Sequence, residues 1–533
     1  MNSIFYKIAK TSVGLALVCT PVVFSSCEGT VLDLEPVSSL TDETAYATSD
    51  RCELSLIGAY DAVQCGNYSA GSWSRGYPLG SASIMQGEMR GEDMINRASF
   101  YQYTYESIYN ASSTQNNIAF WNCSFEAINR INVVLAGEKE AYDNGVIDES
   151  TYTRYEGELK FLRGVVYHYL MIHFCEPYNL SNLNNDYGLP LYLTPISSTE
   201  SIEAAMQTHR STVEETYAQI IADLKEASVK LPETSSVNNL TRATRGAAYA
   251  FLTRVYLHMR DWNNVETYAE EVMKLGKYAL EADPISTFTN YSSNSESIFS
   301  IENNSNDNAS VNGAMFSMFS CRNGARYLVS MSPLLCNDTR WLEDDKRRSE
   351  YILYDGAGSE AVTNYGVYFC DKFRSTTRSD YSPIIRYAEV LLNYAEAAAR
   401  LGDKDTALKY LNEVRDRALA NPAVQTYTLS DFSTTTDLVS AILFERRIEF
   451  LGEGRRWEDI HRLAADDLCP SGGIPAKVRW TAVNGTNVFG YGVALPETGL
   501  KAYDYTDRRF LWPIPVDETT YNSVLASEQN VGW

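Results

Sequence analysis

Two stretches of the chain share one pattern: YAFLTRVYLHMRDWNNVETYAEEV (residues 249–272) and LLNYAEAAARLGDKDTALKYLNEV (residues 391–414). Apolar, aromatic or small residues recur in both at the same offsets of 3, 4, 7, 16, 20 and 23 from the first residue. The first four of these positions fall on one face of a helix, and the last three fall on one face of a second helix. Polar, turn-forming residues separate the two, at 261–264 and at 402–405. The pattern predicts two helix–turn–helix units.

This unit resembles the tetratricopeptide repeat, which has a period of about 34 residues. The small residues Thr253 and Ala395 let the first helix of each unit approach its partner. One pair of helices cannot bury its apolar face alone, so such units stack against neighbours. Further segments have helical periodicity: 116–136, 151–174, 212–229, 241–260 and 264–275. The sequence therefore predicts a mostly α fold, with helical repeats within 116–275 and 384–463.

Helix 212–229 also carries signals for both of its ends. Ser211 and Glu214 are spaced as a capping box, and Pro232 follows as a terminator. Three other regions lack such signals and are rich in Asn, Ser, Gly and Tyr: 64–114, 276–383 and 466–512. Short strands are predicted there at 296–301 and 366–373. Loops this long in a compact domain are usually functional or disordered, and their aromatic content favours packed, functional loops.

The N-terminus has the features of an export signal. Residues 1–26 carry Lys7 and Lys10 but no acidic residue, and an apolar run follows at 13–24. Small residues then precede Cys27, as in a bacterial lipoprotein signal, where that cysteine becomes the lipidated first residue. The alternative is a plain secretory signal with an incidental cysteine. We expect a signal at 1–26, a tether at 27–45 and one domain over 46–533.

Composition excludes several classes of function. The net charge is −23, so the chain has no basic footprint for nucleic acid, and an anionic membrane surface would repel it.

None of the 10 cysteines forms a C-x-x-C pair, which argues against a zinc site. Cys52 and Cys65 are the nearest candidates for a disulfide, and most other cysteines are expected to be buried. The 5 histidines form no H-E-x-x-H motif. The sequence predicts no metal, no cofactor and no catalytic centre.

Several phrases, taken in order, carry a family resemblance: FLRG (161–164), GLPL (188–191), PIIRYAEVLLNYAEA (383–397), LNEVRDRA (411–418), ERRIEF (445–450), EGRRWEDI (453–460), LWPIP (511–515) and QNVG (529–532). Together they resemble the SusD/RagB family of Bacteroidetes outer-membrane lipoproteins. The resemblance spans essentially the whole chain after the signal. It implies about four tetratricopeptide-like helix pairs packed against a loop-rich face with a few short strands.

The resemblance also implies a function. Family members are non-catalytic proteins of the cell surface, held in the outer membrane only by their lipid anchor. They capture a glycan, or sometimes a peptide, and deliver it to a SusC-like TonB-dependent barrel. We expect the repeats, including helix 212–229, to contact that barrel. Glu445, Arg446, Arg447 and Glu449 share one helix and are interpreted as a structural ion-pair network rather than as an acid–base pair.

The ligand site is predicted from chemistry alone, because the family's binding aromatics lie outside its shared phrases. A pyranose offers an apolar C–H face and a ring of hydroxyls, so it needs a flat aromatic ring with polar neighbours. Loop aromatics suit this role better than aromatics between helices. The candidates are Trp73, Tyr77, Tyr101 and Tyr103 with Arg75 and Asn96, followed by Trp341 and Tyr327. The alternative for each is core packing that anchors a loop.

Two other functions share some of these features. A surface scaffold would use the concave face of the repeats to bind a protein partner. An exported glycosidase would need two carboxylates on either side of the scissile bond, about 5–9.5 Å apart. The chain has 68 acidic residues, and nothing in the sequence singles out such a pair. We therefore favour a binding lipoprotein over both alternatives.

Overall fold

The computed structural model describes residues 44–64, 75–183, 185–356 and 363–533. The predicted signal, Cys27, Cys65 and Trp73 lie outside these residues. The longer helices are α1 (Ser49–Gln64), α2 (Ser81–Arg90), α4 (Ala119–Asp143), α5 (Glu149–Phe174), α7 (Val213–Lys230), α8 (Arg245–Met259), α9 (Trp262–Lys274), α15 (Tyr387–Leu401), α16 (Lys404–Asp416), α18 (Thr435–Glu449) and α19 (Arg455–Arg462). Within the described residues, no helix is both long and apolar enough to cross a membrane.

Short elements make up the rest. The short helices are α3 (Gln102–Tyr105), α6 (Thr199–Ala205), α10 (Ser286–Thr289), α11 (Ser310–Gly313), α12 (Met315–Phe319), α13 (Pro333–Cys336), α14 (Arg347–Glu350), α17 (Pro422–Gln425), α20 (Val516–Tyr521) and α21 (Ser523–Ser527). The strands are β1 (Met94–Asn96), β2 (Ser297–Ile301), β3 (Val329–Met331), β4 (Ile352–Tyr354), β5 (Tyr368–Cys370), β6 (Ser382–Arg386), β7 (Gly473–Ile474), β8 (Lys477–Val478), β9 (Gly499–Leu500) and β10 (Tyr503–Asp504). Single turns of other helix types occur at η1 (Ser99–Tyr101), η2 (Thr114–Ile118), η3 (Leu429–Asp431), η4 (Trp480–Ala482) and η5 (Arg508–Phe510).

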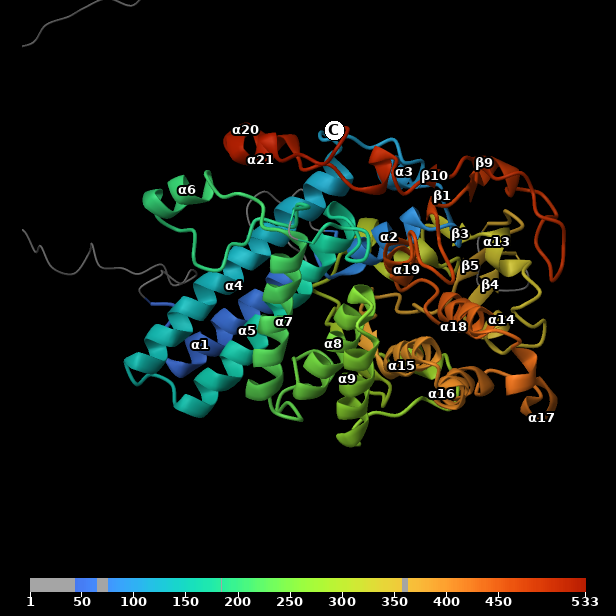
Figure 1. The fold of residues 1–533 in the computed structure, drawn as a ribbon, viewed down its shortest axis with the longest axis horizontal. Helices are drawn as coiled ribbons and strands as arrows, with labels where there is room; N and C mark the ends of the chain where they lie inside the picture. The colour runs from blue at the N-terminus through green and yellow to red at the C-terminus, as the bar shows by residue number, and fades with distance from the viewer. Residues whose placement is uncertain (1–43, 65–74, 184, 357–362) are drawn as a thin grey trace, which may run out of the picture.

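The predicted helical repeats are confirmed. The two stretches first quoted fold as the pairs α8/α9 and α15/α16, and Asp261 and Asp403 cap the second helix of each pair. Figure 1 shows α1, α4, α5 and α7 side by side at one end of the molecule, followed by α8/α9 and then α15/α16. The predicted capping box is shifted by one residue, because Thr212 and Glu215 form it. This fold class is mostly α, as expected.

The loop-rich face is built on short strands. β1, β3, β5 and β4 form an antiparallel sheet in that order, and β2 pairs with β6. Both predicted strands are present, as β2 and β5. The sequence did not predict α1 or α2. All ten residues of α2 are buried, polar ones such as Gln86 and Glu88 included, so hydrophobicity does not mark which residues face the core.

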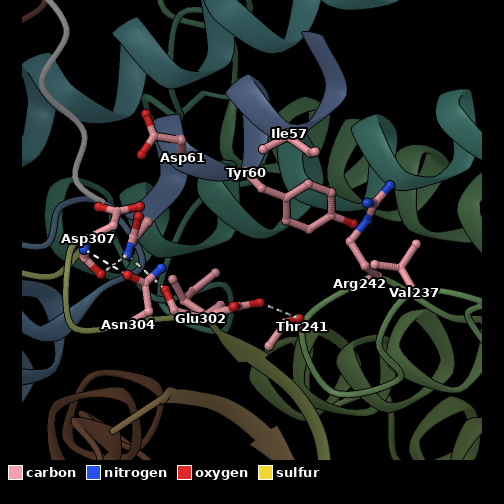
Figure 2. A pocket seen from close by; sticks show the side chains of 11 residues that line it. Ile57, Tyr60, Asp61, Val237, Thr241, Arg242, Glu302, Asn304 and Asp307 are labelled. Atoms are coloured by element: carbon pink, nitrogen blue, oxygen red, sulfur yellow. Dashed lines mark hydrogen bonds between the residues drawn. The ribbon is translucent and has the colours of Figure 1, made fainter. Parts of the chain in front are cut away.

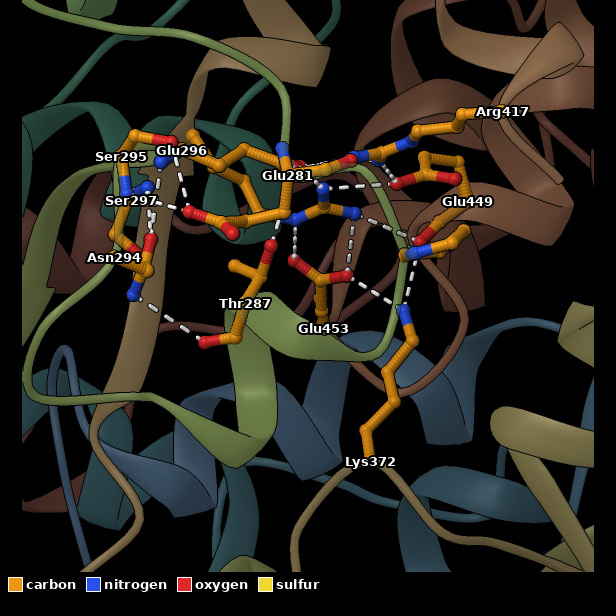
Figure 3. A network of polar contacts seen from close by, with 12 residues as sticks. Glu281, Thr287, Asn294, Ser295, Glu296, Ser297, Lys372, Arg417, Glu449 and Glu453 are labelled. Atoms are coloured by element: carbon orange, nitrogen blue, oxygen red, sulfur yellow. Dashed lines mark hydrogen bonds and ion pairs between the residues drawn. The ribbon is translucent and has the colours of Figure 1, made fainter.

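The seam between the repeats and the loop-rich face is charged rather than apolar. The Arg386 guanidinium contacts Glu296, Glu449 and Glu453, and each of these four side chains is at most 3% exposed (Figure 3). The Lys372 Nζ lies 2.7 Å from Glu453, and the Arg417 Nη2 lies 2.6 Å from Glu449. Burial would raise the pKa of Glu449, but the charges of Arg417, Arg386 and Arg347 hold that pKa well below its usual range.

The network predicted on residues 445–449 is confirmed, and its partners come from other elements. Glu445 and Glu449 share the guanidinium of Arg347, at 2.5 and 2.9 Å. Arg446 binds Asp459 at 2.9 Å, while Arg447 binds Asp93. A buried charge requires partners of this kind, because an unpaired one is strongly destabilising. The helix is therefore a structural element, as interpreted from its sequence.

The seven cysteines in the described residues are free thiols, and six of them are buried. Burial raises the pKa of Cys370 to about 12, which keeps its thiol protonated and unreactive. Among the histidines, His168, His173, His258 and His461 are buried. Burial lowers the pKa of His461 to about 3, so its ring is neutral at physiological pH. These residues belong to the core, as expected.

Candidate ligand-binding site

Most of the sequence-predicted site residues that the structure describes lie in the core. Five of them are at most 6% exposed: Tyr77, Asn96, Tyr101, Tyr327 and Trp341. Tyr77 packs on Phe120 and its hydroxyl accepts a 2.8 Å hydrogen bond from Gln86. Asn96 binds Ala98 and Gln102 within its own loop. These side chains offer no face to a ligand here, because a loop-rich region without long helices needs large rings to fill its core.

Two of the predicted residues are accessible. Tyr103 is 46% exposed, on α3. Arg75 is half-buried, with its guanidinium 4.4 Å from the centre of the Phe100 ring. Its backbone lies against Gly313, where an added Cβ would come within 2.8 Å of the Arg75 carbonyl oxygen. Arg75 therefore adjoins α11, which follows the polar loop after β2. Trp73 lies outside the described residues.

A pocket opens next to that loop, between the end of α1 and the segments 237–242 and 301–307 (Figure 2). We call it the α1 pocket. Its volume is about 260 Å³, just below the range of roughly 300–1,000 Å³ usual for small-molecule sites. It is lined by Ile57, Tyr60, Asp61, Gln64, Val237, Thr241, Arg242, Ile301, Glu302, Asn304 and Asp307.

Gln64, the last residue of α1, holds the pocket together. Its amide Nε2 donates to the Glu302 carbonyl at 2.8 Å, to Asn303 Oδ1 at 3.2 Å and to the Asp307 carbonyl at 3.4 Å. Asn304 Oδ1 in turn accepts the backbone N–H of Asp307 at 3.0 Å. The loop after β2 is thereby fixed to the helix. These hydrogen bonds hold the wall of the pocket in place without a ligand.

The two sides of the α1 pocket differ in charge. On one side Tyr60 donates to Glu158 at 2.6 Å, and Arg242 pairs with the same carboxylate. Burial, then the charge of Glu158, raises the pKa of Tyr60 well above its ordinary value, so its hydroxyl stays protonated. On the other side Figure 2 shows Asp61, Asn304 and Asp307. This side offers carboxylate and amide oxygens that can accept hydrogen bonds.

The pocket thus combines an apolar wall with several hydrogen-bonding groups. Tyr60, Ile57 and Val237 supply the apolar surface. This is the arrangement that suits a sugar ring, with its apolar C–H face and its hydroxyls. Sequence reasoning missed the pocket because its residues come from three distant segments and include a single aromatic. The run ENNSNDN at 302–308, which is rich in Asn, was the one local signal.

Among the described residues, no group of three or more His, Cys, Asp or Glu side chains is arranged to hold a metal ion.

Comparison with known proteins identifies the family of the chain. The sequence profile of the SusD family matches residues 342–533, and a SusD-like profile described as "Starch-binding associating with outer membrane" matches residues 72–257.

The chain belongs to the SusD family.

Relatives and solved structures agree with this assignment. A SusD-like protein of Formosa agariphila is 24% identical, with 88% of this chain and 94% of that protein covered. A SusD superfamily protein of Bacteroides fragilis has a crystal structure that is 26% identical and superimposes with a TM-score of 0.71, covering 90% of this chain and 98% of that one. A surface glycan-binding protein of Bacteroides uniformis has the same fold at 21% identity and a TM-score of 0.67, with 91% and 99% covered.

The two family profiles leave most of the α1 pocket unmatched. Ile57, Tyr60, Asp61 and Gln64 precede residue 72, and the loop 301–307 lies between the matched ranges. The seam residues Arg386, Glu449 and Glu453 all lie within the matched range 342–533. The matched ranges therefore include these seam residues but only the segment 237–242 of the α1 pocket.

Proposed function

We propose that this SusD-family chain is a cell-surface lipoprotein that binds a glycan in the α1 pocket and passes it to a SusC-like TonB-dependent transporter of the outer membrane. The observation that carries the proposal is the position of the pocket. It is preformed, it joins apolar and hydrogen-bonding groups, and eight of its eleven lining residues lie outside the two matched ranges. Proteins that share a fold carry their individual functions in sites built on that fold. The name of the Bacteroides uniformis relative supports a glycan.

The first test is calorimetric titration of the full chain in detergent against a panel of polysaccharides and host glycans. Val237 is 63% exposed at the pocket, so Val237→Trp would fill the pocket without disturbing the core. This variant should lower the affinity for the bound glycan roughly tenfold or more, because the added ring occupies the space of the ligand. Val229→Trp is the matched control, since Val229 is 78% exposed on α7 and does not line the pocket.

Each outcome has a definite reading. Saturable binding that Val237→Trp removes and Val229→Trp keeps supports glycan capture in the α1 pocket. Binding that both variants keep would refute this location. Binding of peptides in place of glycans would refute the ligand class. Release of shortened products from a polysaccharide would refute the proposal that the chain is a binding protein without catalysis.

Membrane attachment and transfer are separate parts of the proposal. Cys27 is the proposed lipidation site, so Cys27→Ser should abolish incorporation of labelled fatty acid and release the chain from the outer membrane. The repeats are proposed to face the transporter. Charge reversal at two exposed residues of α7, Glu214→Lys and Lys225→Glu, should weaken co-purification with the transporter. An intact complex in this variant would contradict the proposed surface.

A further inference from the structure

A second, larger hollow lies just beyond the C-terminal end of α5. It is bounded by the residues after α5, by the loop at 185–187, by residues 505–508 and by the chain's last segment at 529–531. We call it the 187–505 groove, after the two tyrosines that line it. Its volume is about 560 Å³, within the roughly 300–1,000 Å³ typical of ligand sites. None of its lining residues lines the α1 pocket.

One buried arginine fixes two walls of this groove. Arg210 donates to the Gly188 carbonyl at 2.7 Å and to the Tyr187 carbonyl at 3.2 Å. The same guanidinium donates to the Glu528 carbonyl at 2.8 Å and to Asn530 Oδ1 at 2.9 Å. The third wall is fixed by the Tyr505 N–H, which donates to Gly472 at 3.0 Å. The groove is therefore a rigid feature of the fold, which lowers the entropy cost of binding.

The charges of the groove do not cancel. Asp507 pairs with Arg509 at 2.8 Å, and Arg508 donates to the Gly532 carbonyl and stacks on Trp533. Glu176, in contrast, makes no hydrogen bond or ion pair with any residue that the structure describes. Burial, and after it the charge of Asp186, raises the pKa of Glu176 to about 7. A ligand that brings a positive charge would relieve this repulsion, whereas an anionic ligand would increase it.

Two of the residues that line the groove with Glu176 are tyrosines. Tyr187 is 45% exposed, and Tyr505 is half-buried on the opposite segment. Such rings accept the apolar C–H face of a sugar. We propose that the 187–505 groove is a second binding site, which takes an oligosaccharide carrying free amino groups and pairs one ammonium with Glu176. The choice of a sugar over a basic peptide rests on the proposed function. The charge preference rests on the groove itself.

The test compares a β-1,4-linked glucosamine tetramer with its fully N-acetylated counterpart, by calorimetric titration of the full chain in detergent near neutral pH. We expect saturable binding of the amine form and at least tenfold weaker binding of the acetylated form, which carries no charge. Glu176→Gln should lower the affinity for the amine form roughly tenfold, the loss expected for one charged hydrogen bond. Equal affinity for the two tetramers would overturn the proposal.

A matched variant separates specific pairing from general attraction to an acidic protein. Glu203→Gln removes the same charge from the exposed surface of α6, outside the groove. It should leave the affinity unchanged, and an equal loss in Glu203→Gln and Glu176→Gln would overturn the proposal. Affinity should also fall between pH 7 and pH 5.5, as Glu176 becomes protonated. The other charged residues that line the groove are Asp186, Asp507 and Arg508.

The α1 pocket is tested independently in the same experiment. Val237→Trp should not change binding of the glucosamine tetramer, because Val237 lies outside the groove. Loss of amine binding in Val237→Trp but not in Glu176→Gln would move the site to the α1 pocket and overturn the second site. Failure of the neutral glycan panel with retained amine binding would refute the proposed function of the α1 pocket and leave the groove standing.

Discussion

Carboxylates are used differently at the seam and in the 187–505 groove. At the seam, Glu449 and Glu453 are fully buried, and each is held by more than one cation. In the groove, the charge of Asp186 acts on Glu176, which pairs with no cation among the residues described. Seam charges are committed to holding the repeats against the loop-rich face. The Glu176 carboxylate in the groove, which has no such partner among the residues described, can pair with a group outside the chain. A carboxylate that is paired within the chain serves the fold, whereas one without a partner is a candidate to bind a ligand.

The sharpest way to test this contrast is to break the seam. Arg386→Met removes the cation shared by Glu296, Glu449 and Glu453 and leaves three buried carboxylates short of a partner. We expect the free energy of unfolding to fall by about 3–5 kcal/mol, measured by urea denaturation. Lys139→Ala, which breaks a pair that is 51% and 55% exposed, should cost less than about 1 kcal/mol. A loss at Arg386 no larger than at Lys139 would contradict the structural role of the seam.

A second test concerns packing in the loop-rich face. A Cβ added at Gly87 of α2 would come within 2.3 Å of the Gly454 carbonyl oxygen, so the two backbones approach as closely as glycine allows. Gly87→Ala should destabilise the protein by about 1–3 kcal/mol in the same denaturation experiment. At Gly58, in α1, an added Cβ meets nothing within 4 Å. Gly58→Ala should therefore stabilise by about 0.5–1 kcal/mol. A tolerated Gly87→Ala would mean that this face is loosely packed.

The third test uses pH. Burial raises the pKa of Glu88 to about 8, from an ordinary value of 4.5, although Gly454 donates a hydrogen bond to it. A carboxyl with a raised pKa in the folded state loses stability as pH rises between those two values. Glu88→Gln does not ionise, so its advantage over the parent should grow by at least about 1 kcal/mol from pH 5 to pH 8. Melting temperatures across this range measure it, and a constant difference would contradict the prediction.

The smallest effect is expected in the α1 pocket. Asp61 is half-buried at its rim, and Asp61→Asn should change the free energy of unfolding by less than about 0.5 kcal/mol. Urea denaturation beside Arg386→Met gives the comparison directly. A large loss of stability at Asp61 would show that the pocket, like the seam, serves the fold.

Periodicity made the helical half predictable. The offsets shared by residues 249–272 and 391–414 identify α8/α9 and α15/α16, because α9 and α16 each bury one apolar face against the almost wholly buried α8 and α15. The same signal fails for α2, which has only ten residues and buries polar side chains such as Gln86 and Glu88 together with its apolar ones. It also could not reveal that Arg386 pairs with Glu296, since those residues are 90 positions apart. Charge networks of this kind depend on tertiary contacts that local sequence does not encode.

The site was less predictable for a physical reason. Sequence chemistry predicts that loop aromatics contact the ligand, but Tyr77, Tyr101 and Trp341 are at most 1% exposed. A region made of short strands and turns has little aliphatic core, so its large rings are drawn inside. The residues that line the two hollows, such as Asp61, Asn304 and Glu176, are ordinary polar residues. Only the folded chain brings them together.

The close approach of Gly87 to Gly454 also bears on the order of folding. Glu88 of α2 receives its hydrogen bond from a residue 366 positions later, and β1 pairs with a strand that begins at Val329. Contacts so distant along the chain form slowly, because a long loop must close before they contribute any stability. Synthesis runs from the N-terminus, so α2 is made long before Gly454, which packs against it. A nascent chain that stops before residue 454 therefore cannot complete the loop-rich face, whereas α4, α5, α7, α8 and α9 already have their neighbours.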